Sequence, residues 1–355
     1  LHQNFRWHRR RKRRRTMIID KPYYEDNTRI SNSSIGWFLK KGPLYFRNML
    51  DGKEEGLKLP QLEKGTMIHE YILQPDEFWN DYTILEYEVP KVKQQKDFCD
   101  WYSIFKDTNP LEDNDKLLLD SYNKAYSNKL SEDAKLSIAK DFALRYDEYI
   151  KSKSLKNNKK AISFADLNML KTIKSNIEKH KKANELLTDT PGVESHNEFH
   201  INWTFPIKTD SLKMDENKTW YAPCKSLLDR CIFDHVNKKI ILIDLKTTSD
   251  VYNFKHSVEE FDYYRQIAYY LLAITWYMKD QDIDISDYDC EAYIIAIQTN
   301  GNYEVRVFNM FNETELDSRK DTIISALSEL SYHYQTNNWE HTRSYYEGNG
   351  TEELE

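Results

Sequence analysis

An apolar stretch at residues 241–250, ILIDLKTTSD, constrains the fold more than any other part of the sequence. Its β-branched and leucine residues are typical of a buried strand, yet Asp244 and Lys246 interrupt it. Successive side chains of a strand point to opposite faces, so Asp244 and Lys246 share one face and Leu245 lies on the other. Two interpretations are open at this point: an ion pair at the end of a strand, or an active site.

Length and composition indicate a globular protein. The 355 residues suffice for one large domain or two ordinary ones, and the 39% apolar, 31% charged and 14% aromatic content argues against disorder. No apolar run approaches the roughly 20 residues that cross a bilayer, and the basic stretch at the N-terminus is not the pattern expected of a secretory signal, because no apolar core follows it. The cysteines lack the paired spacing of a zinc site and predict reduced thiols in a cytoplasmic protein. They are Cys99, Cys224, Cys231 and Cys290.

Charge is distributed unevenly along the chain. Residues 1–16 contain eight of the 51 basic residues and no acidic one, so the rest carries 43 basic and 58 acidic side chains, a net charge of −15. This basic leader, predicted to be disordered, either binds nucleic acid or is translated ahead of a start at Met17, and we slightly favour the second interpretation. In that case DNA contacts must come from local basic grooves.

The pattern of apolar residues predicts one α/β domain over residues 17–340, followed by a flexible tail at 341–355. Helices are predicted from Ser31, Asn32 or Ser33 to a break at Gly42–Pro43, and from about Leu62 to Pro75. A lysine-rich region of helical periodicity at about 95–188 predicts a helical insertion with a structural role. Strands and helices are predicted beyond it. The strands lie at 198–207, 219–236, 238–248, 289–299 and 303–310, and the helices at 257–280 and 313–335.

A second carboxylate accompanies Asp244. Asp229 lies in the preceding strand, and the turn DHVNKK between the two strands makes them antiparallel neighbours, so Asp229 and Asp244 can face one cleft. Two carboxylates and the backbone carbonyl of Leu245 form a hard oxygen site suited to Mg²⁺ or Mn²⁺. Lys246 beside them can stabilise developing charge or orient a water for attack on a phosphodiester.

Two further stretches bear on this site. GTMIHEYIL places His69 in a helix, and YRQIAYYLLA places Gln266 and Tyr270 one turn apart on one helix face. Each residue also has an ordinary explanation: a core histidine, a solvated glutamine, a packed tyrosine and an ion pair between Asp229 and Lys246. Their occurrence together, in order, favours the active site.

In this order the residues resemble a known family. Gly65 to His69 reads G-x-x-x-H, Asp229 follows, residues 244–246 read D-x-K, and residues 266–270 read Q-x-x-x-Y. The sequence resembles the RecB/RecE-type branch of the PD-(D/E)XK nuclease superfamily, closest to phage exodeoxyribonuclease VIII-like proteins, over roughly residues 30–330. The resemblance implies an α/β fold with a restriction-endonuclease-like core, in which helices flank a mixed central sheet and a helical insertion is present.

The resemblance also implies roles for individual residues. His69, Asp229, Asp244 and the carbonyl of Leu245 would bind Mg²⁺ or Mn²⁺, and Lys246 would act on the attacking water. Gln266 and Tyr270 would orient Lys246 or the scissile phosphate. Glu198 and Glu70 are weaker candidates that the motifs do not require.

The function implied is that of a magnesium-dependent exodeoxyribonuclease, which degrades linear double-stranded DNA from its ends, 5′ to 3′, for recombination or repair. It would act in the cytoplasm of a bacterial host as a ring-shaped homo-oligomer beside a single-strand annealing protein, with no membrane. One alternative is a structure-specific or single-strand endonuclease of the same fold, resembling CRISPR-associated adaptation nucleases, which the scattered cysteines disfavour. Another is a non-catalytic DNA-binding protein on a decayed nuclease fold, which the retained Asp244 and Lys246 disfavour.

Overall fold

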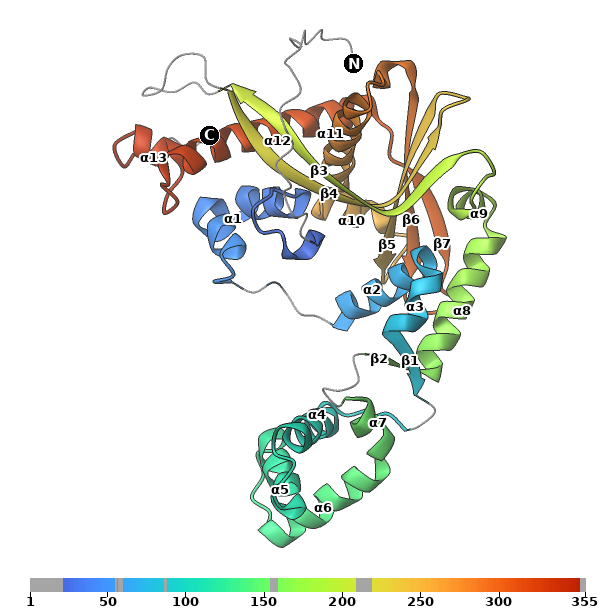
Figure 1. Ribbon diagram of the computed structural model, residues 1–355, viewed down its shortest axis with the longest axis vertical. Coiled ribbons are helices and arrows are strands. Elements are labelled where there is room, and N and C mark those ends of the chain that lie inside the picture. Colours follow the sequence, from blue (N-terminus) through green and yellow to red (C-terminus); the bar gives the residue numbers. More distant parts are fainter. Residues whose placement is uncertain are drawn as a thin grey trace. The chain divides into compact units, whose positions relative to one another are not determined.

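The structure is a computed structural model that describes residues 22–54, 56, 60–85, 88–153, 159–208 and 219–351 (Figure 1). The basic leader at 1–16 lies outside the described residues. The chain divides into two compact units, the first comprising Leu1–Gly56, His200–Leu227 and Asp321–Glu355, and the second Leu57–Phe199 and Leu228–Lys320. Every candidate site residue belongs to the second unit. The prediction of one domain over 17–340 stays a prediction.

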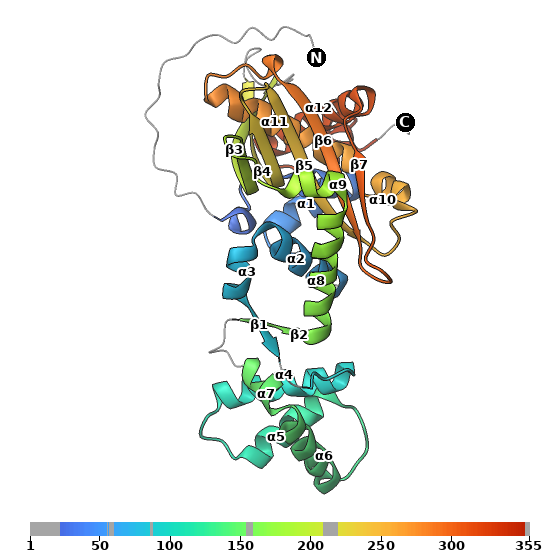
Figure 2. The ribbon, with the colours of Figure 1, turned by 90° about the vertical axis from the view of Figure 1, so that its right-hand side faces the viewer.

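A mixed five-stranded sheet has the spatial order β3-β4-β5-β6-β7, which Figure 2 shows. The strands β4 and β5 are antiparallel, β5 and β6 are parallel, and β6 and β7 are antiparallel. The predicted α/β class with a mixed sheet and helices is therefore confirmed. The strands are β3 (Glu194–Lys208), β4 (Thr219–Asp234), β5 (Lys239–Thr248), β6 (Asp289–Gln298) and β7 (Val305–Asn309).

The hairpin of β4 and β5 determines where the polar residues of β5 lie. Its register runs from Asp234↔Lys239 to Arg230↔Ile243, and the Asp234 carboxylate accepts the backbone N–H of Asn237 in the turn (2.9 Å). The predicted antiparallel hairpin is thus confirmed. The described pairing with β4 ends at Ile243, whereas β5 continues to pair with β6 as far as Thr248. The D-x-K segment, residues 244–246, therefore lies where β5 pairs with β6 but no longer with β4.

The core of the second unit lies on the face of β5 that carries Leu245. Helices α2 (Pro60–Leu73) and α8 (Phe164–Lys179) bury apolar side chains there, next to those of the sheet. These are Met67, Ile68, Leu170, Ile173, Ile177, Ile243, Leu245, Ile295 and Ile297. A Cβ on Gly65 would lie 3.1 Å from Oγ1 of Thr247, so glycine allows α2 to approach β5 closely. This approach fixes the position of His69, one turn further along α2.

The opposite face of β5 is covered by α11 (Tyr263–Asp280), because Gln266 of this helix contacts Asp244. The sequence predicts a single helix over 257–280. This prediction is wrong at one point: the structure has two helices, α10 (Phe254–Glu260) and α11, separated at Phe261 and Asp262. Asp262 has a φ of 51°, which no α-helix accommodates.

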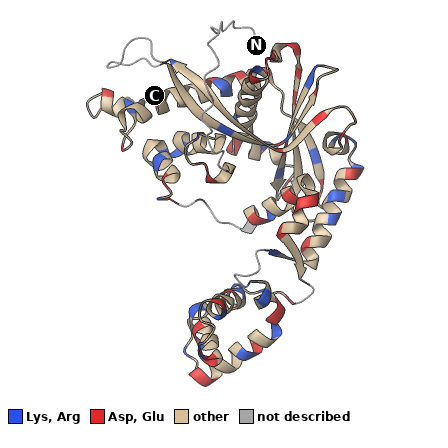
Figure 3. Ribbon diagram, in the orientation of Figure 1, with Lys and Arg blue, Asp and Glu red and all other residues tan. Residues whose placement is uncertain are grey.

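The region 95–188 is helical, but its helices belong to two different cores. Helices α4 (Lys93–Thr108), α5 (Asn114–Ala125), α6 (Glu132–Arg145) and α7 (Asp147–Ser152) pack on one another around Phe98, Leu118 and Tyr149. By contrast, α8 and α9 (Lys181–Leu187) contribute to the core beneath the sheet. Two short parallel strands, β1 (Tyr82–Leu85) and β2 (Lys160–Ser163), flank α4–α7 in sequence and were not predicted. Figure 3 shows acidic and basic residues interspersed over α4–α7.

The first unit contains α1 (Asn32–Leu50), whose N-cap is Ser31, one of the three predicted caps. Gly42 has a φ of 81° and a ψ of 179°, which no α-helix accommodates, so the predicted break at Gly42–Pro43 is confirmed and α1 consists of a helical segment on each side of it. Helix α12 (Glu313–Thr336) begins in the second unit and ends in the first, and α13 (Arg343–Glu347) lies within the predicted tail. The short helices α3 (Pro75–Asp81), η1 (Tyr23–Glu25) and η2 (Ile285–Asp287) complete the described elements. Within the described residues, no helix is both long and apolar enough to span a membrane.

Candidate active site

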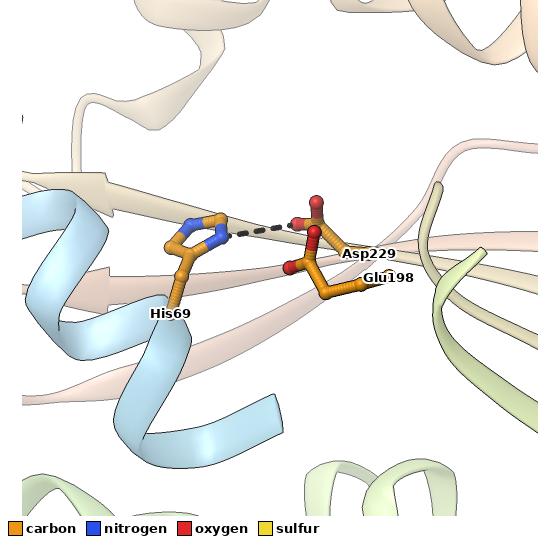
Figure 4. Close-up of side chains that lie close together, drawn as sticks. All are labelled: His69, Glu198 and Asp229. Carbon is orange, nitrogen blue, oxygen red and sulfur yellow. Dashed lines mark ion pairs between the residues drawn. The ribbon is translucent and has the colours of Figure 1, made fainter. Parts of the chain in front are cut away.

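Three potential metal ligands converge from three elements (Figure 4). His69 on α2, Glu198 on β3 and Asp229 on β4 each offer a ligand atom, and these atoms all lie within 4.8 Å of one another. His69 Nδ1 is 3.4 Å from Asp229 Oδ2, and all three side chains are half-buried. An imidazole with two carboxylates is a donor set that binds divalent cations such as Mn²⁺ and Mg²⁺.

Glu198, which the sequence motifs do not require, is the third member of this group. It has a φ of 48° within the strand β3, a left-handed conformation that is unfavourable for any residue but glycine. Strain of this kind persists only where the surroundings impose it, and it recurs at functional sites. The kink turns the carboxylate of Glu198 toward His69 and Asp229 (Figure 4). No local sequence pattern marks this residue, because its neighbours read as an ordinary strand.

A hydrogen-bond network holds the backbones that carry the three ligands. Asn197, which precedes Glu198, donates through Nδ2 to the carbonyl of Leu73 at the end of α2 (2.7 Å). Its Oδ1 accepts from Nη1 of Arg230, which follows Asp229 (2.7 Å). Arg230 is 2% exposed and also donates to the carbonyl of Leu186 (2.9 Å). The strand kink, the helix α2 and the strand β4 are thereby fixed relative to one another.

The side chain of Asp229 accepts a backbone hydrogen bond from β5 where the backbone of β4 no longer does. Its Oδ2 accepts the backbone N–H of Leu245 (2.7 Å), just beyond the last described backbone pair of β4 and β5. A buried N–H without a partner is unfavourable, so the carboxylate both satisfies this donor and is oriented by it. The side chain of Leu245 is buried in the core on the other face, as the strand periodicity predicts. A role for the Leu245 carbonyl as a metal ligand stays a prediction.

Asp244 and Lys246 lie on the same face of β5, as predicted, with Lys246 Nζ 2.6 Å from Asp244 Oδ2. Asp244 is 1% exposed, and burial together with the nearby Asp229 raises its pKa to about 6, although the Lys246 ammonium opposes the shift. Burial alone would lower the pKa of Lys246, but the carboxylates of Asp244 and Asp229 outweigh it and raise the pKa. Lys246 is therefore a cation at neutral pH.

Gln266 and Tyr270 form a chain with Asp244. Nε2 of Gln266 donates to Asp244 Oδ1 (2.9 Å) and approaches the Tyr270 hydroxyl (2.8 Å). The contact of Gln266 is thus with Asp244, the partner of Lys246, whereas the resemblance implied Lys246 or the phosphate. Lys246 instead lies over the ring of Tyr263, 5.1 Å from its centroid, a contact the sequence analysis did not foresee.

Negative charge accumulates around the three ligands. Burial raises the pKa of Glu198 to about 7, and Asp229, Glu70 and Asp244 add to the shift. Glu70, the other weak candidate, accepts a hydrogen bond from the Tyr82 hydroxyl and lies 3.4 Å from Lys160 Nζ, so its carboxylate already has partners outside the ligand group. The raised pKa values of Glu198 and Asp244 are those expected of carboxyl groups crowded together by burial and like charge.

The residues present fit a divalent cation. Two carboxylates and an imidazole are within common reach, and Asp244 Oδ2, buried beside Lys246, accepts no hydrogen bond of good geometry from any residue that the structure describes. The predicted ligand set is brought together in part: His69 and Asp229 form the group with Glu198. Asp244 lies next to them, held by Gln266 and Lys246.

Known proteins similar to this chain were found only among solved structures. No protein family model matches the chain, and neither does any curated protein. Among solved structures, the chain is similar to a provisionally assigned exonuclease from Eubacterium rectale, with a TM-score of 0.45 and 11% identity. The similarity covers 90% of this chain and 85% of that one.

Proposed function

We propose that this protein is a metal-dependent nuclease that hydrolyses phosphodiester bonds in DNA. The observation that carries the proposal is the convergence of His69, Glu198 and Asp229 beside a lysine held by a buried aspartate. The ligand group suits a hard divalent cation, and the lysine is a fixed positive charge next to it. Phosphodiester hydrolysis needs both a cation to bind the phosphate and a group to stabilise developing negative charge.

The protein side chains have separable roles in this proposal. His69, Glu198 and Asp229, with Asp244 next to them, would hold Mg²⁺ or Mn²⁺. The bound ion would act as a Lewis acid and lower the pKa of a bound water. Lys246 would donate hydrogen bonds to a phosphate oxygen, and its ammonium would stabilise the charge that develops there. Asp244, itself fixed by Gln266, orients the ammonium, so Gln266 and Tyr270 are positioning residues.

The finer proposal concerns the substrate. We propose an exonuclease acting on the ends of linear duplex DNA, 5′ to 3′, in recombination or repair, and assembling as a ring beside an annealing protein. Its support is the ordered set of motifs and the acidic character of residues 17–355. A protein with net charge −15 over that range attracts DNA weakly from a distance, so a ring threaded on the DNA is a physically suitable way to remain bound.

The test is a mixture of linear and supercoiled plasmid incubated with the purified protein and Mg²⁺. We expect the linear form to be degraded and the closed circles to remain, because circles have no end to thread. Lys246→Met should abolish degradation, whereas the matched control Lys239→Met should not. Lys239 lies on the same strand but pairs with Glu291, 2.8 Å away.

Two results would contradict the proposal at different levels. Nicking of the circles as fast as loss of the linear form would favour the endonuclease alternative. Absence of cleavage under all metal conditions, with DNA binding retained, would favour a non-catalytic binder.

A further inference from the structure

A row of aromatic rings leads from Lys246 to the protein surface. Tyr263 lies beneath the ammonium of Lys246, and its ring is stacked with that of Phe261, at a centroid distance of 5.9 Å and an interplanar angle of 27°. On another side Tyr263 stacks with Phe254, also at 5.9 Å, which is 1% exposed. Phe261 is 52% exposed. One end of the row is anchored in the core, and the other presents an aromatic ring to solvent beside the proposed site.

The residue after Phe261, Asp262, has a strained backbone and is held by two arginines. Phe261 follows α10, and Asp262 adopts a φ of 51° before α11 begins. The carboxylate of Asp262 accepts from Nε of Arg319 (2.6 Å) and from Nε of Arg265 (3.2 Å), which is 5% exposed. These charge-assisted contacts offset the left-handed conformation and keep the turn in one geometry. The exposed ring of Phe261 is thus presented from a fixed position.

A single exposed phenylalanine is ordinary on a protein surface and needs no function. Phe261 differs because three independent features coincide: its exposure, its stacking on the ring under Lys246, and its place at a strained turn held by buried charge.

We propose that Phe261 and Tyr263 form a stacking platform for a nucleobase of the nucleotide whose phosphate contacts Lys246. This inference rests on the proposed nuclease function. A phosphate held at Lys246 places its own nucleoside beside Tyr263, and the next ring outward is Phe261. The phenylalanine ring has no polar group, so it accepts any of the four bases, as a nuclease without sequence preference requires.

The platform has a consequence for the substrate. A base stacks on a protein ring only when it has left the base pair, and unpairing is least unfavourable at a mismatched or frayed end. The platform therefore favours DNA whose terminal pair is open. It would hold that base while the phosphate lies at Lys246.

The experiment uses a short duplex that carries 2-aminopurine at its terminal nucleotide, bound to the full chain in Ca²⁺. Stacking on the platform should quench the fluorescence, and Phe261→Ala should remove the quenching and weaken binding of a mismatched end about 5- to 100-fold. Phe261→Trp should restore both, and Phe261→Leu, which keeps the apolar bulk without a ring, should behave like alanine. Tyr252→Ala is the matched control, since Tyr252 is another aromatic residue that is 67% exposed, and its ring lies against Arg306 instead.

The results separate this inference from the proposed function. If the wild type degrades DNA while Phe261→Ala and Phe261→Leu keep the quenching and the affinity, the platform is refuted and the nuclease assignment stands. If the wild type neither binds Mn²⁺ nor cleaves DNA, the proposed function itself fails. Circular dichroism and Mn²⁺ titration of each variant should match the wild type, because Phe261 contacts none of the proposed ligands.

Discussion

Replacement of Glu198 by glutamine should stabilise the metal-free protein and weaken its metal binding at the same time. Glu198 is crowded by Asp229, Asp244 and Glu70, and burial together with these charges raises its pKa from 4.5 to about 7. Glutamine has the same shape without the charge. An ordinary surface glutamate would show neither effect, so the opposite signs of the two changes test the site directly.

The magnitude follows from the pKa. The pKa of Glu198 in the folded protein is about 2.5 above its ordinary value, and each pKa unit corresponds to 1.36 kcal/mol. At pH 8 the ionised carboxylate can therefore destabilise the folded protein by about 3 kcal/mol at most. Since Glu198 is half-buried, solvent screening reduces this to about 1–2 kcal/mol. Between roughly pH 5 and 7 the folded protein retains a proton that the unfolded chain has lost, so the stability of the metal-free wild type falls as the pH rises. In the Glu198→Gln variant the free energy of unfolding should decrease less over this pH range.

Urea unfolding in EDTA at pH 5.5 and pH 8, followed by Mn²⁺ titration, measures both effects. Glu194→Gln is the matched control on the same strand, because hydrogen bonds from His196 and His235 lower the pKa of Glu194. That variant should gain no stability at pH 8 and should bind Mn²⁺ as the wild type does. The reasoning is refuted if Glu198→Gln is no more stable than the wild type at pH 8, or if its affinity for Mn²⁺ is unchanged.

Three further predictions concern the same site. Asp244→Ala and Lys246→Ala should each abolish cleavage with an unchanged circular dichroism spectrum, and wild-type turnover by either variant would exclude these residues from the site. Ca²⁺ should support DNA binding with little cleavage, because its longer and looser coordination positions a water poorly, and equal rates in Ca²⁺ and Mg²⁺ would argue against the metal site. Gly65→Ala should slow cleavage about 10- to 100-fold by displacing α2 from Thr247, and Thr247→Ala should restore the rate in the double variant if that contact is the cause.

The parts of the site that depend on local periodicity were predictable. The two-residue period of a strand placed Asp244 and Lys246 on one face, and the turn before Lys239 specified an antiparallel hairpin. The spacing of Gln266 and Tyr270 likewise placed both on one helix face, where they contact each other. In each case neighbours in the sequence determine the geometry, so a short stretch contains the information needed.

The parts that depend on distant residues were not predictable. The division of residues 95–188 between two cores follows from which apolar face meets which partner, and helical periodicity does not specify the partner. Glu198 is a ligand candidate because Asn197 is tied to Leu73 and Arg230, which are distant in sequence. The strand pattern around Glu198 predicts an ordinary extended residue. Its kink is imposed by tertiary contacts.

The break between α10 and α11 has the same origin as the kink at Glu198. The apolar periodicity of a helix runs through Asp262, so local preference alone favours one continuous helix. Arg319, 57 residues further along the chain, contributes an ion pair to Asp262 at the break. Glu198 and Asp262 are two of the described non-glycine residues with positive φ, and both lie next to the proposed site. Asn197, which precedes Glu198, accepts a hydrogen bond from the buried Arg230, and Asp262 accepts one from the buried Arg265. At these two residues tertiary contacts override the local preference, and a functional site is a place where such opposition to the local rules is expected.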